Sequence, residues 1–323
     1  MTEFITIGEP LVVFAAEEVD RPLCKVGAFR KFIAGAELNV AIGLARLGHS
    51  TQYISQVGKD SLGDFILEEA KCQQVGTKFL EQVEEYSTGF YLKEKVSDGD
   101  PKVEYHRKNS AASHYQAEKL PQKLLTESKV LHVTGIMAAI STDGFVSVLS
   151  ALKMMNQAGK LTVFDPNIRP SLWRSQERMI EQTNLLAREA KIILPGVSEG
   201  QLLTALSALE DIADFYLKQS EITQIVVIKN GSKGAFVKGK NIPSFSVSSY
   251  PAKEVVDTVG AGDGFATGLI SGLLDKVELS EAVKRACAIG ALAVQSVGDN
   301  EGYPTRETLI DFMNQNLEME IKK

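Results

Sequence analysis

Short apolar runs rich in β-branched residues alternate along the chain with longer segments of helical periodicity. Six runs are expected to form core strands: Phe4–Ile7, Gln52–Val57, Val130–Thr134, Leu161–Phe164, Ile192–Leu194 and Ile225–Ile228. Six segments carry apolar residues at helical spacing: Leu38–Leu47, Leu62–Gln74, Gly144–Asn156, Ser198–Leu209, Gly262–Leu274 and Ser280–Gln295. Such alternation favours a mostly parallel sheet with helices on both faces. The pattern therefore predicts a doubly wound α/β fold.

Two stretches, at about 10–33 and 86–113, depart from this alternation. The second contains the alternating runs Tyr91–Val96 and Val103–Arg107, which are joined by the turn-rich residues Ser97–Pro101. This arrangement predicts a β-hairpin outside the main sheet, as part of a small sheet that could act as a lid over a cleft. A decoration of the sheet edge or a dimer contact is the alternative interpretation.

Length and composition set limits on the class of protein. The 323 residues are enough for one α/β domain over residues 1–323 with a small appendage. A net charge of −6 without a dense Lys/Arg run argues against nucleic acid or an anionic membrane as the main partner. The three cysteines are far apart in the chain, which indicates reduced thiols and a cytoplasmic location. We find no signal peptide and no apolar run long enough to span a bilayer.

The segment from Asp257 to Ala266, with the sequence DTVGAGDGFA, is the most informative part of the chain. Its small residues lead into a helical pattern, so several backbone N–H groups can converge on an anion at the helix N-terminus. Asp263 would then lie beside a bound phosphate, where it could accept the proton of an attacking hydroxyl. The alternative is an aspartate that only caps a helix after a glycine hinge.

Two familiar nucleotide-binding loops are absent from the sequence. There is no Gly-x-x-x-x-Gly-Lys-Ser/Thr, and the glycines of this segment do not complete Gly-x-Gly-x-x-Gly because Phe265 occupies the last position. Both a P-loop NTPase and a dinucleotide oxidoreductase are therefore disfavoured.

The same segment resembles the C-terminal signature of the ribokinase-like (PfkB) family of carbohydrate kinases. The resemblance implies ATP as phosphate donor, Mg²⁺ as cofactor and Asp263 as the catalytic base. It also implies an anion hole made by the amides of Gly260, Ala261, Gly262 and Asp263. A monovalent cation is a further candidate ligand.

A second block, Ala34–Ala41 followed by Gly58–Gly63, resembles the N-terminal signature of this family. Gly35 and Ala36 would let a polyol approach the backbone, and Asn39 offers both a donor and an acceptor to hydroxyl groups. Without the resemblance, Asn39 would be interpreted as a residue of the helix surface or cap.

The nucleotide side is predicted from weaker matches. The loop containing Lys229, Gly231, Lys233 and Gly234 resembles the family's nucleotide loop, although the residues by themselves favour a strand–glycine–strand hairpin. The helical residues from Cys287 to Ala291 resemble a wall of the adenine pocket, with ordinary helix packing as the alternative.

One position departs from the family pattern. Gly196–Glu199 stands where the family has Asn-x-x-Glu, so the asparagine is missing. Glu199 could still bind Mg²⁺ through water, or it could simply favour a helix N-terminus. Asn167 is a candidate for the polar contact near the phosphates.

Aromatic and basic residues suggest a substrate class. Tyr105 and Arg107 lie on one face of a predicted lid strand, with Tyr91 on its neighbour, and Arg169 follows the carboxyl end of a core strand. Two arginines suit a carboxylate better than an uncharged hexose. Alternatively, Arg107 is a solvated lid residue and Arg169 pairs with Asp165.

The segments Gly8–Val12, Tyr105–Ser113 and Asp165–Pro170 resemble the branch of the family that phosphorylates 2-keto-3-deoxygluconate. The implied substrate contacts are Gly35, Ala36, Asn39, Tyr91, Tyr105, Arg107, Arg169 and Asp257. A fructokinase or ribokinase, or a sugar-binding relative without catalysis, are the alternative functions. An exposed lid sheet also favours a homo-oligomer that pairs through it.

Overall fold

The computed structural model describes residues 2–99, 101–296 and 298–321, and its described strands form two sheets. The larger sheet has nine strands in the order β13-β12-β11-β10-β9-β8-β1-β4-β5. Their bounds are β1 Phe4–Ile7, β4 Thr51–Gly58, β5 Gly76–Val83, β8 Val130–Thr134, β9 Leu161–Asp165, β10 Ile192–Ile193, β11 Ile225–Lys229, β12 Ala235–Gly239 and β13 Ile242–Val247. Pairing is parallel from β5 to β11 and antiparallel in β12 and β13.

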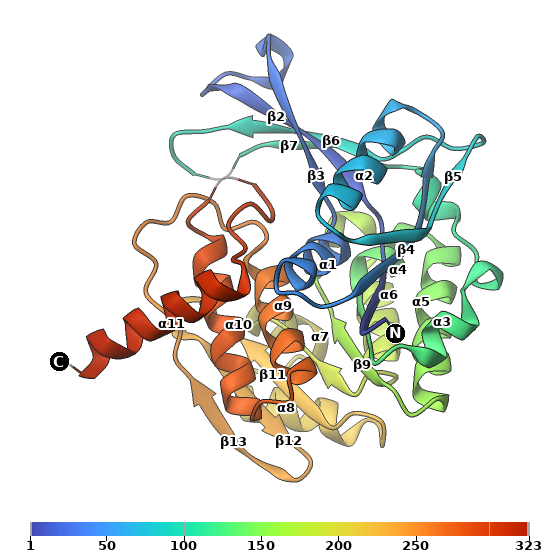
Figure 1. Cartoon of the computed structure of the whole chain (residues 1–323). Helices are drawn as coiled ribbons and strands as arrows, with labels where there is room; N and C mark the ends of the chain where they lie inside the picture. The colour runs from blue at the N-terminus through green and yellow to red at the C-terminus, as the bar shows by residue number, and fades with distance from the viewer. Residues whose placement is uncertain (1, 100, 297, 322–323) are drawn as a thin grey trace.

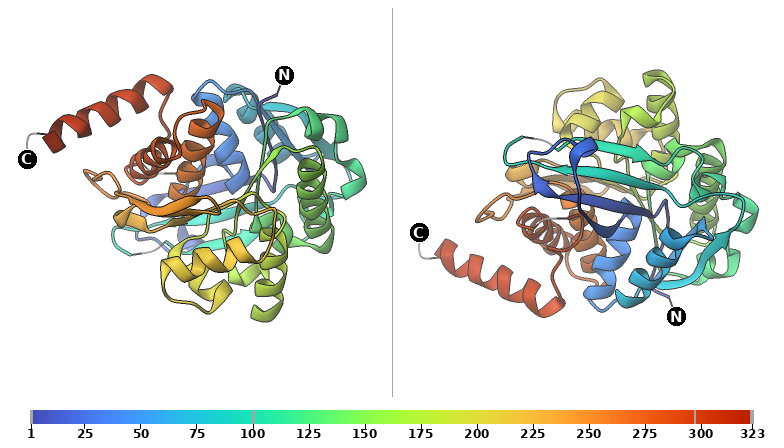
Figure 2. Two further views of the ribbon diagram at one scale, coloured as in Figure 1. Left: turned by 90° about the horizontal axis from the view of Figure 1, so that it is seen from below. Right: turned by 90° about the horizontal axis from the view of Figure 1, so that it is seen from above.

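Helices cover both faces of this sheet (Figures 1 and 2). One face carries α1 Ala36–Arg46, α2 Ser61–Cys72, α9 Ala261–Leu274 and α10 Leu279–Ala293. The other carries α3 Gln122–Glu127, α4 Gly135–Ile140, α5 Thr142–Gln157, α6 Gln176–Ala187, α7 Val197–Thr204 and α8 Leu209–Lys218. Helix α11, Arg306–Ile321, packs against α10 at its start and then projects from the body of the molecule. None of the described helices is long and apolar enough to cross a membrane.

Successive side chains of each core strand point to opposite faces of the sheet, and this produces two hydrophobic cores. Phe4 and Val163 pack in the cluster with α1 and α9, whereas their neighbours Ile5 and Phe164 pack in the cluster with α5 and α8. Successive side chains of a strand point to opposite faces, so a strand covered on both sides must be apolar at nearly every position. This explains why the core strands read as continuous apolar runs, and the predicted doubly wound fold is confirmed.

The chain reverses its direction of winding at β1. From β1 it adds β4 and β5 on one side, and it then returns to add β8, β9, β10 and β11 on the other. The gap between β1 and β8 is therefore a topological switch point, and ligands of open α/β sheets bind beyond the carboxyl ends of the strands at such a point.

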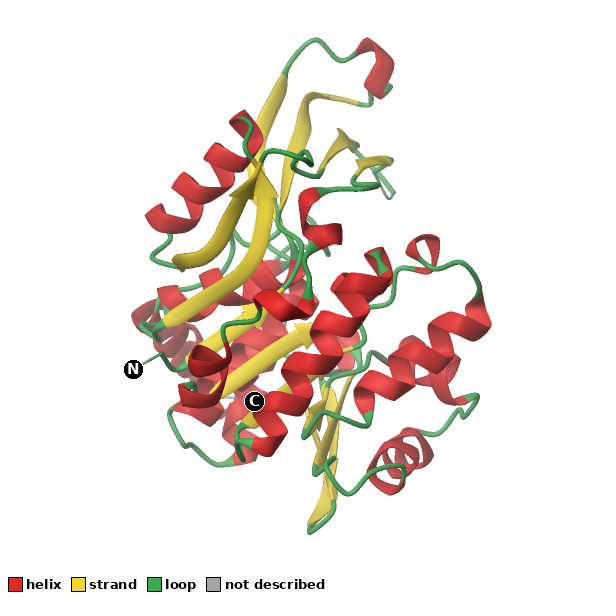
Figure 3. Ribbon diagram, turned by 90° about the vertical axis from the view of Figure 1, so that its right-hand side faces the viewer, coloured by secondary structure: helices red, strands yellow, loops and turns green. Residues whose placement is uncertain are grey.

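A second sheet of four strands lies beyond the carboxyl ends of the main-sheet strands (Figures 1 and 3). Its order is β3-β2-β6-β7, with β2 Leu11–Val19, β3 Phe29–Ala34, β6 Phe90–Lys95 and β7 Val103–His106. Strands β6 and β7 are antiparallel and form the predicted hairpin. The small sheet predicted beside the main one is thus present.

Some elements differ from those predicted. The helix expected over Ser198–Leu209 ends at Thr204, because Ala205 adopts a left-handed conformation with φ of 58°, and α8 begins at Leu209. Helix α6 and strands β5, β12 and β13 were not predicted. Polar residues interrupt the apolar pattern of these elements, and much of their stability comes from packing against the rest of the molecule.

Candidate active site

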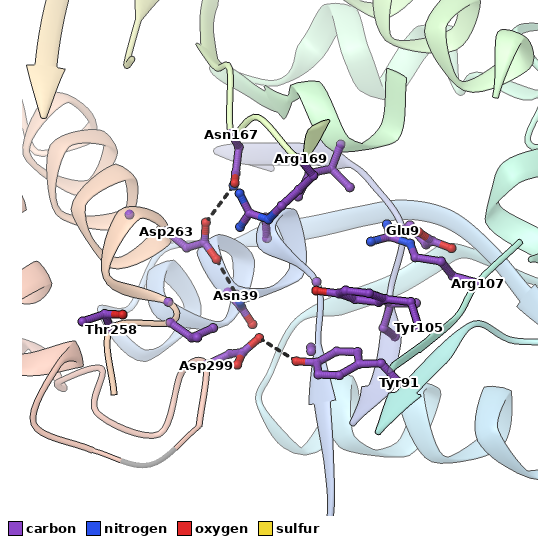
Figure 4. A pocket seen from close by; sticks show the side chains of 18 of the residues that line it. Glu9, Asn39, Tyr91, Tyr105, Arg107, Asn167, Arg169, Thr258, Asp263 and Asp299 are labelled. Atoms are coloured by element: carbon purple, nitrogen blue, oxygen red, sulfur yellow. Dashed lines mark hydrogen bonds and ion pairs between the residues drawn. The ribbon is translucent and has the colours of Figure 1, made fainter. Parts of the chain in front are cut away.

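A cavity of about 330 Å³ lies between the small sheet and the main sheet, beside the start of α9 (Figure 4). Its walls come from the loop after β1, the start of α1, strands β6 and β7, the loop after β9, and the segment that leads into α9. A volume of this size suits a small, polar metabolite.

Backbone geometry at the start of α9 requires glycine. Gly260 caps the helix with φ of 80°, and a Cβ built on it would lie 1.8 Å from the carbonyl oxygen of Asp299. The Tyr303 hydroxyl donates to the Gly260 carbonyl at 2.7 Å and holds this turn in place. Because α9 begins at Ala261, the first N–H groups of the helix have no acceptor within it and lie at the positive end of its dipole.

Asp263 lies in the first turn of α9 and faces the cavity. Asn39 Nδ2 donates to its Oδ2 at 2.9 Å, and Asn167 Nδ2 donates to its Oδ1 at 3.3 Å. Figure 4 shows the two amides approaching from different elements. Burial raises the pKa of Asp263 to about 7, and the hydrogen bond from Asn39 opposes this shift. A carboxylate with such a pKa can exchange a proton near neutral pH.

Asp299 is a further carboxyl group in the cavity wall, and no motif of the sequence marks it. The Tyr91 hydroxyl donates to its Oδ2 at 3.4 Å. Burial raises the pKa of Asp299 to about 6. It lies in an irregular segment after α10, so only the fold brings it beside the strands of the small sheet.

Arg107 is held by a buried acid. It is 9% exposed, its Nη2 pairs with Glu9 Oε2, and Ser110 Oγ donates to Glu9 Oε1. Glu9 follows β1 directly, at the switch point, and it was missed as a site residue although it lies within the segment Gly8–Val12. Tyr91 and Tyr105 pair across the strands with ring centroids 5.1 Å apart, and Arg107 lies over the Tyr105 ring. Arg107 is therefore buried and paired in this structure.

The loop after β9 is shaped by two carboxylates. Asp165 Oδ1 accepts the Asn167 N–H at 3.1 Å and its Oδ2 pairs with Lys229 Nζ at 2.5 Å. Glu199 Oε1 accepts the Ile168 N–H at 2.8 Å. These bonds hold Asn167 at a φ of 39° and leave the exposed Arg169 with its Nη1 on the Ile168 carbonyl at 3.1 Å. Asp165 thus pairs with Lys229 and not with Arg169.

The cavity brings together most of the predicted site residues. Those in its wall are Gly35, Ala36, Asn39, Tyr91, Tyr105, Arg107, Asn167, Arg169, Lys229, Gly260, Gly262 and Asp263. Eight predicted residues are not in that wall: Ala261, Asp257, Gly231, Lys233, Gly234, Cys287, Ala291 and Glu199. Asp257 instead pairs with Lys93 of β6 and accepts the Val259 N–H.

The predicted nucleotide residues other than Asn167 and Lys229 lie outside the cavity wall, on two other parts of the chain. Gly231, Lys233 and Gly234 form the turn between β11 and β12, with positive φ at both glycines. Cys287 and Ala291 are buried on α10, and burial raises the pKa of the Cys287 thiol to about 12. Glu199 places both carboxylate oxygens on backbone N–H groups, those of Ile168 and Gly196. The roles predicted for these six residues stay predictions.

Comparison with known proteins agrees with this geometry. The model of the pfkB family carbohydrate kinases matches residues 1–306. The chain is 45% identical to 2-dehydro-3-deoxygluconokinase of Bacillus subtilis (strain 168) over 320 residues, which cover 99% of this chain and 98% of the relative. A crystal structure of a PfkB protein from Polaromonas sp. JS666 is similar at 41% identity and a TM-score of 0.88, covering 96% of this chain and 99% of the other.

A structure of an E. coli protein described as a putative Ribokinase II, in complex with ATP and Mg²⁺, has a TM-score of 0.89 at 26% identity and covers 98% of this chain and 100% of its own. The match over nearly the whole length and the Gly-Ala-Gly-Asp turn that opens α9 lead to the same conclusion. The chain belongs to the pfkB family of carbohydrate kinases.

Proposed function

We propose that the protein transfers the γ-phosphate of ATP to the primary hydroxyl of 2-keto-3-deoxygluconate. The observation that carries this proposal is Asp263, a carboxylate in the wall of a sugar-sized cavity at the N-terminus of a fourteen-residue helix. The 45% identity to a 2-dehydro-3-deoxygluconokinase over nearly the full chain supports this substrate.

In the proposed reaction, Asp263 accepts the proton of the hydroxyl as its oxygen attacks the γ-phosphorus. The new O–P bond forms while the bond to the β,γ-bridging oxygen breaks, and ADP leaves. The N–H groups of Gly260, Ala261, Gly262 and Asp263 face the developing negative charge, where fixed donors are most effective. Asn39 and Asn167 hold the carboxylate oxygens toward the cavity.

Arg169 is the cation best placed for the substrate carboxylate. The charge of Arg107 is already balanced by Glu9, whereas no ion pair within the described residues includes Arg169. A guanidinium can grip a carboxylate through paired hydrogen bonds. Arg107 would add a hydrogen bond and Tyr91 and Tyr105 would close over the sugar chain. Gly35 and Ala36 would let the hydroxyl groups approach the backbone at the start of α1.

The triphosphate would extend from Asp263 toward Lys229 and the turn of Gly231, Lys233 and Gly234. Asn167 would lie near the phosphates, and Cys287 and Ala291 would flank the adenine. The N–H groups at the start of α9, which have no acceptor within the helix, and the Lys229 ammonium fit a phosphate chain. Mg²⁺ keeps most of its water shell and binds mainly through nucleotide phosphates, which it would neutralise. Glu199 would reach it through water. A monovalent cation remains a further proposal.

The small sheet is proposed to act as a lid and as a contact between subunits. Strands β3 and β7 are its edges, and unpaired strand edges favour pairing with another chain. Light scattering on the purified protein tests this assembly, and a monomer at micromolar concentration would contradict it.

The described cysteines are all free, which supports a reducing compartment such as the cytoplasm.

A substrate panel tests the function directly. ADP formation is measured with 2-keto-3-deoxygluconate, its galactonate epimer, fructose and ribose. The proposal expects the highest kcat/KM with a keto-deoxy acid, and a preference for fructose or ribose would support the alternative kinases. ADP formation with none of these sugars would indicate a sugar-binding relative. Asp263→Asn is expected to lower kcat about 10²–10⁴-fold with ATP affinity retained, whereas Asp143→Asn, at an exposed position of α5, leaves kcat unchanged.

A further inference from the structure

A chain of side-chain hydrogen bonds leads from the Asp263 carboxylate to a guanidinium two helical turns away. Asn39 Nδ2 donates to Asp263 Oδ2 at 2.9 Å, and Asn300 Nδ2 donates to Asn39 Oδ1 at 3.0 Å. Arg46 Nη2 donates to Asn300 Oδ1 at 3.4 Å. Asn39 and Arg46 are seven residues apart on α1 and therefore share a face of the helix. Asn300, from the segment after α10, bridges them.

The groups at the two ends of this series of hydrogen bonds determine which side chain donates in each of them. A guanidinium only donates hydrogen bonds and an ionised carboxylate only accepts them, whereas an amide side chain can turn either way. With Arg46 donating, the Asn300 oxygen must face Arg46 and its NH₂ must face Asn39. The Asn39 oxygen then faces Asn300 and its NH₂ faces Asp263. A reversal of Asn39 would set its NH₂ against that of Asn300 and its oxygen against the carboxylate. A reversal of Asn300 would set its oxygen against that of Asn39 and its NH₂ against the guanidinium.

Asn300 is itself firmly held. It is 3% exposed, its carbonyl accepts Arg46 Nη1 and the Tyr303 N–H, and its own N–H donates to Glu301 Oε2 at 3.2 Å. Arg46 also donates through Nε to Gln73 Oε1 at 3.0 Å. Asn39 lines the cavity, but neither Asn300 nor Arg46 is part of the described cavity wall. The side-chain hydrogen bonds that link Asn300 to Asp263 therefore pass through Asn39.

We propose that Asn300, anchored by Arg46, is a positioning residue that fixes the Asn39 amide with its N–H toward Asp263 and so favours the ionised form of this carboxylate and aims it at the substrate hydroxyl. The proposal rests on the proposed kinase function and adds a residue to its machinery. Asn39 is the contact that Asn300 controls, and Asp263 is the group whose protonation responds.

Other charges face Asp263 and set the background against which this contact acts. Asp165 and Asp299 raise the pKa of Asp263, and Arg169 lowers it. Lys229 and Tyr303 also lie within electrostatic range of this carboxylate. Within the described residues, none of these groups is hydrogen-bonded to the Asn300 side chain, so Asn300→Leu removes none of their own contacts.

The test is the pH dependence of kcat/KM in Asn300→Leu, which keeps the size of the side chain and removes both polar atoms. Losing the aligned donor should move the acidic limb of the profile upward by about one to two pH units. It should also lower kcat about tenfold to a hundredfold with a much smaller change in the sugar KM. Arg46→Met should shift the acidic limb in the same direction, and Arg46→Lys should shift it less than Arg46→Met does.

Asn184→Leu is the matched control, because Asn184 is a buried amide on α6 that donates to the Leu203 carbonyl at 2.9 Å. It should lower the melting temperature without moving the pH profile. An Asn300→Leu profile that overlays that of the wild type would overturn the proposal. If Asn300→Leu fails to fold, the two Arg46 variants decide by the same criterion.

A second measurement keeps this inference separate from the proposed function. Carboxyl ¹³C titration of the wild-type protein labelled in aspartate, with the Asp263 signal assigned by its loss in Asp263→Asn, gives the pKa without turnover. An upward shift in Asn300→Leu supports the positioning role even if no sugar of the panel is phosphorylated. An unchanged pKa overturns it even if the kinase activity is found.

Discussion

The ammonium of Lys93, on strand β6 of the small sheet, lies 2.6 Å from Oδ2 of Asp257, and the other oxygen of Asp257 accepts the Val259 N–H at 3.0 Å. One carboxylate thus joins the small sheet to the segment that leads into α9. Both side chains are largely buried, at 12% and 15% exposure. Together with the bond from Tyr91 to Asp299, this pair holds the small sheet over the cavity.

Breaking this ion pair should weaken the closed arrangement of the small sheet. Lys93→Met is expected to raise the sugar KM about three- to tenfold, since a partly buried pair contributes on the order of 1 kcal/mol, with a smaller change in kcat. Steady-state kinetics with varied sugar measures this. Lys59→Met, which removes an exposed pair with Glu84, is the control and should leave KM unchanged. Equal KM values for the two variants would contradict a role for the pair in closure.

The raised pKa of Asp263 makes protein stability depend on pH in a defined direction. Its pKa is about 7 in the folded protein against a model value of 3.8, so the folded state holds a proton that the unfolded state releases. The stabilisation from this proton is complete below pH 3.8 and is lost as the pH rises through 7. In Asp263→Asn the amide does not titrate, so this loss of stability with rising pH does not occur.

The melting temperature of Asp263→Asn relative to the wild type should therefore rise between pH 5 and pH 8. The difference corresponds to about 1–3 kcal/mol. Buried acids that do not interact with Asp263 titrate alike in both proteins and cancel in the comparison. Calorimetry at the two pH values measures it, and a constant difference would show that Asp263 is ionised throughout.

The two arginines of the cavity should respond differently to substitution. Arg107→Ala leaves Glu9 as a buried carboxylate without its cation, so a loss of about 3–5 kcal/mol in the free energy of unfolding is expected. Arg169 is exposed, and Arg169→Ala should leave the free energy of unfolding within about 0.5 kcal/mol of the wild type.

Kinetics on two substrates completes this test. Arg169→Ala should raise KM for the keto-deoxy acid at least about tenfold, with little change for a neutral hexose. Glu9→Gln combined with Arg107→Ala should recover part of the stability that Arg107→Ala loses. A similar change in KM for both substrates would reject Arg169 as the carboxylate contact.

Gly260 should tolerate no side chain. In Gly260→Ala the new Cβ would meet the Asp299 carbonyl oxygen, and the φ of 80° disfavours any L-residue. We expect kcat to fall at least about a hundredfold through displacement of the α9 N–H groups. Gly27→Ala, at an exposed position before β3 with its nearest contact at 3.4 Å, is the control and should keep full activity. Wild-type kcat in Gly260→Ala would reject the anion hole.

The sequence by itself determined the layered architecture and the glycine-rich turn at the start of α9. Strand and helix periods are local properties, so the apolar runs and the Gly-Ala-Gly-Asp turn could be interpreted without knowledge of the fold. Gly35, Ala36 and Asn39 also came from a contiguous segment, and the structure places them in the cavity wall.

The tertiary structure alone decided which groups surround that chemistry. Asp299 meets Tyr91 across 208 positions of the chain, Asn300 meets Asn39 across 261, and Arg107 meets Glu9 across 98. Asp299 and Asn300 are polar and isolated in their segment, so no periodicity or motif marks them. Burial and pairing, which set the charge and orientation of such groups, arise only when the strands and helices pack together.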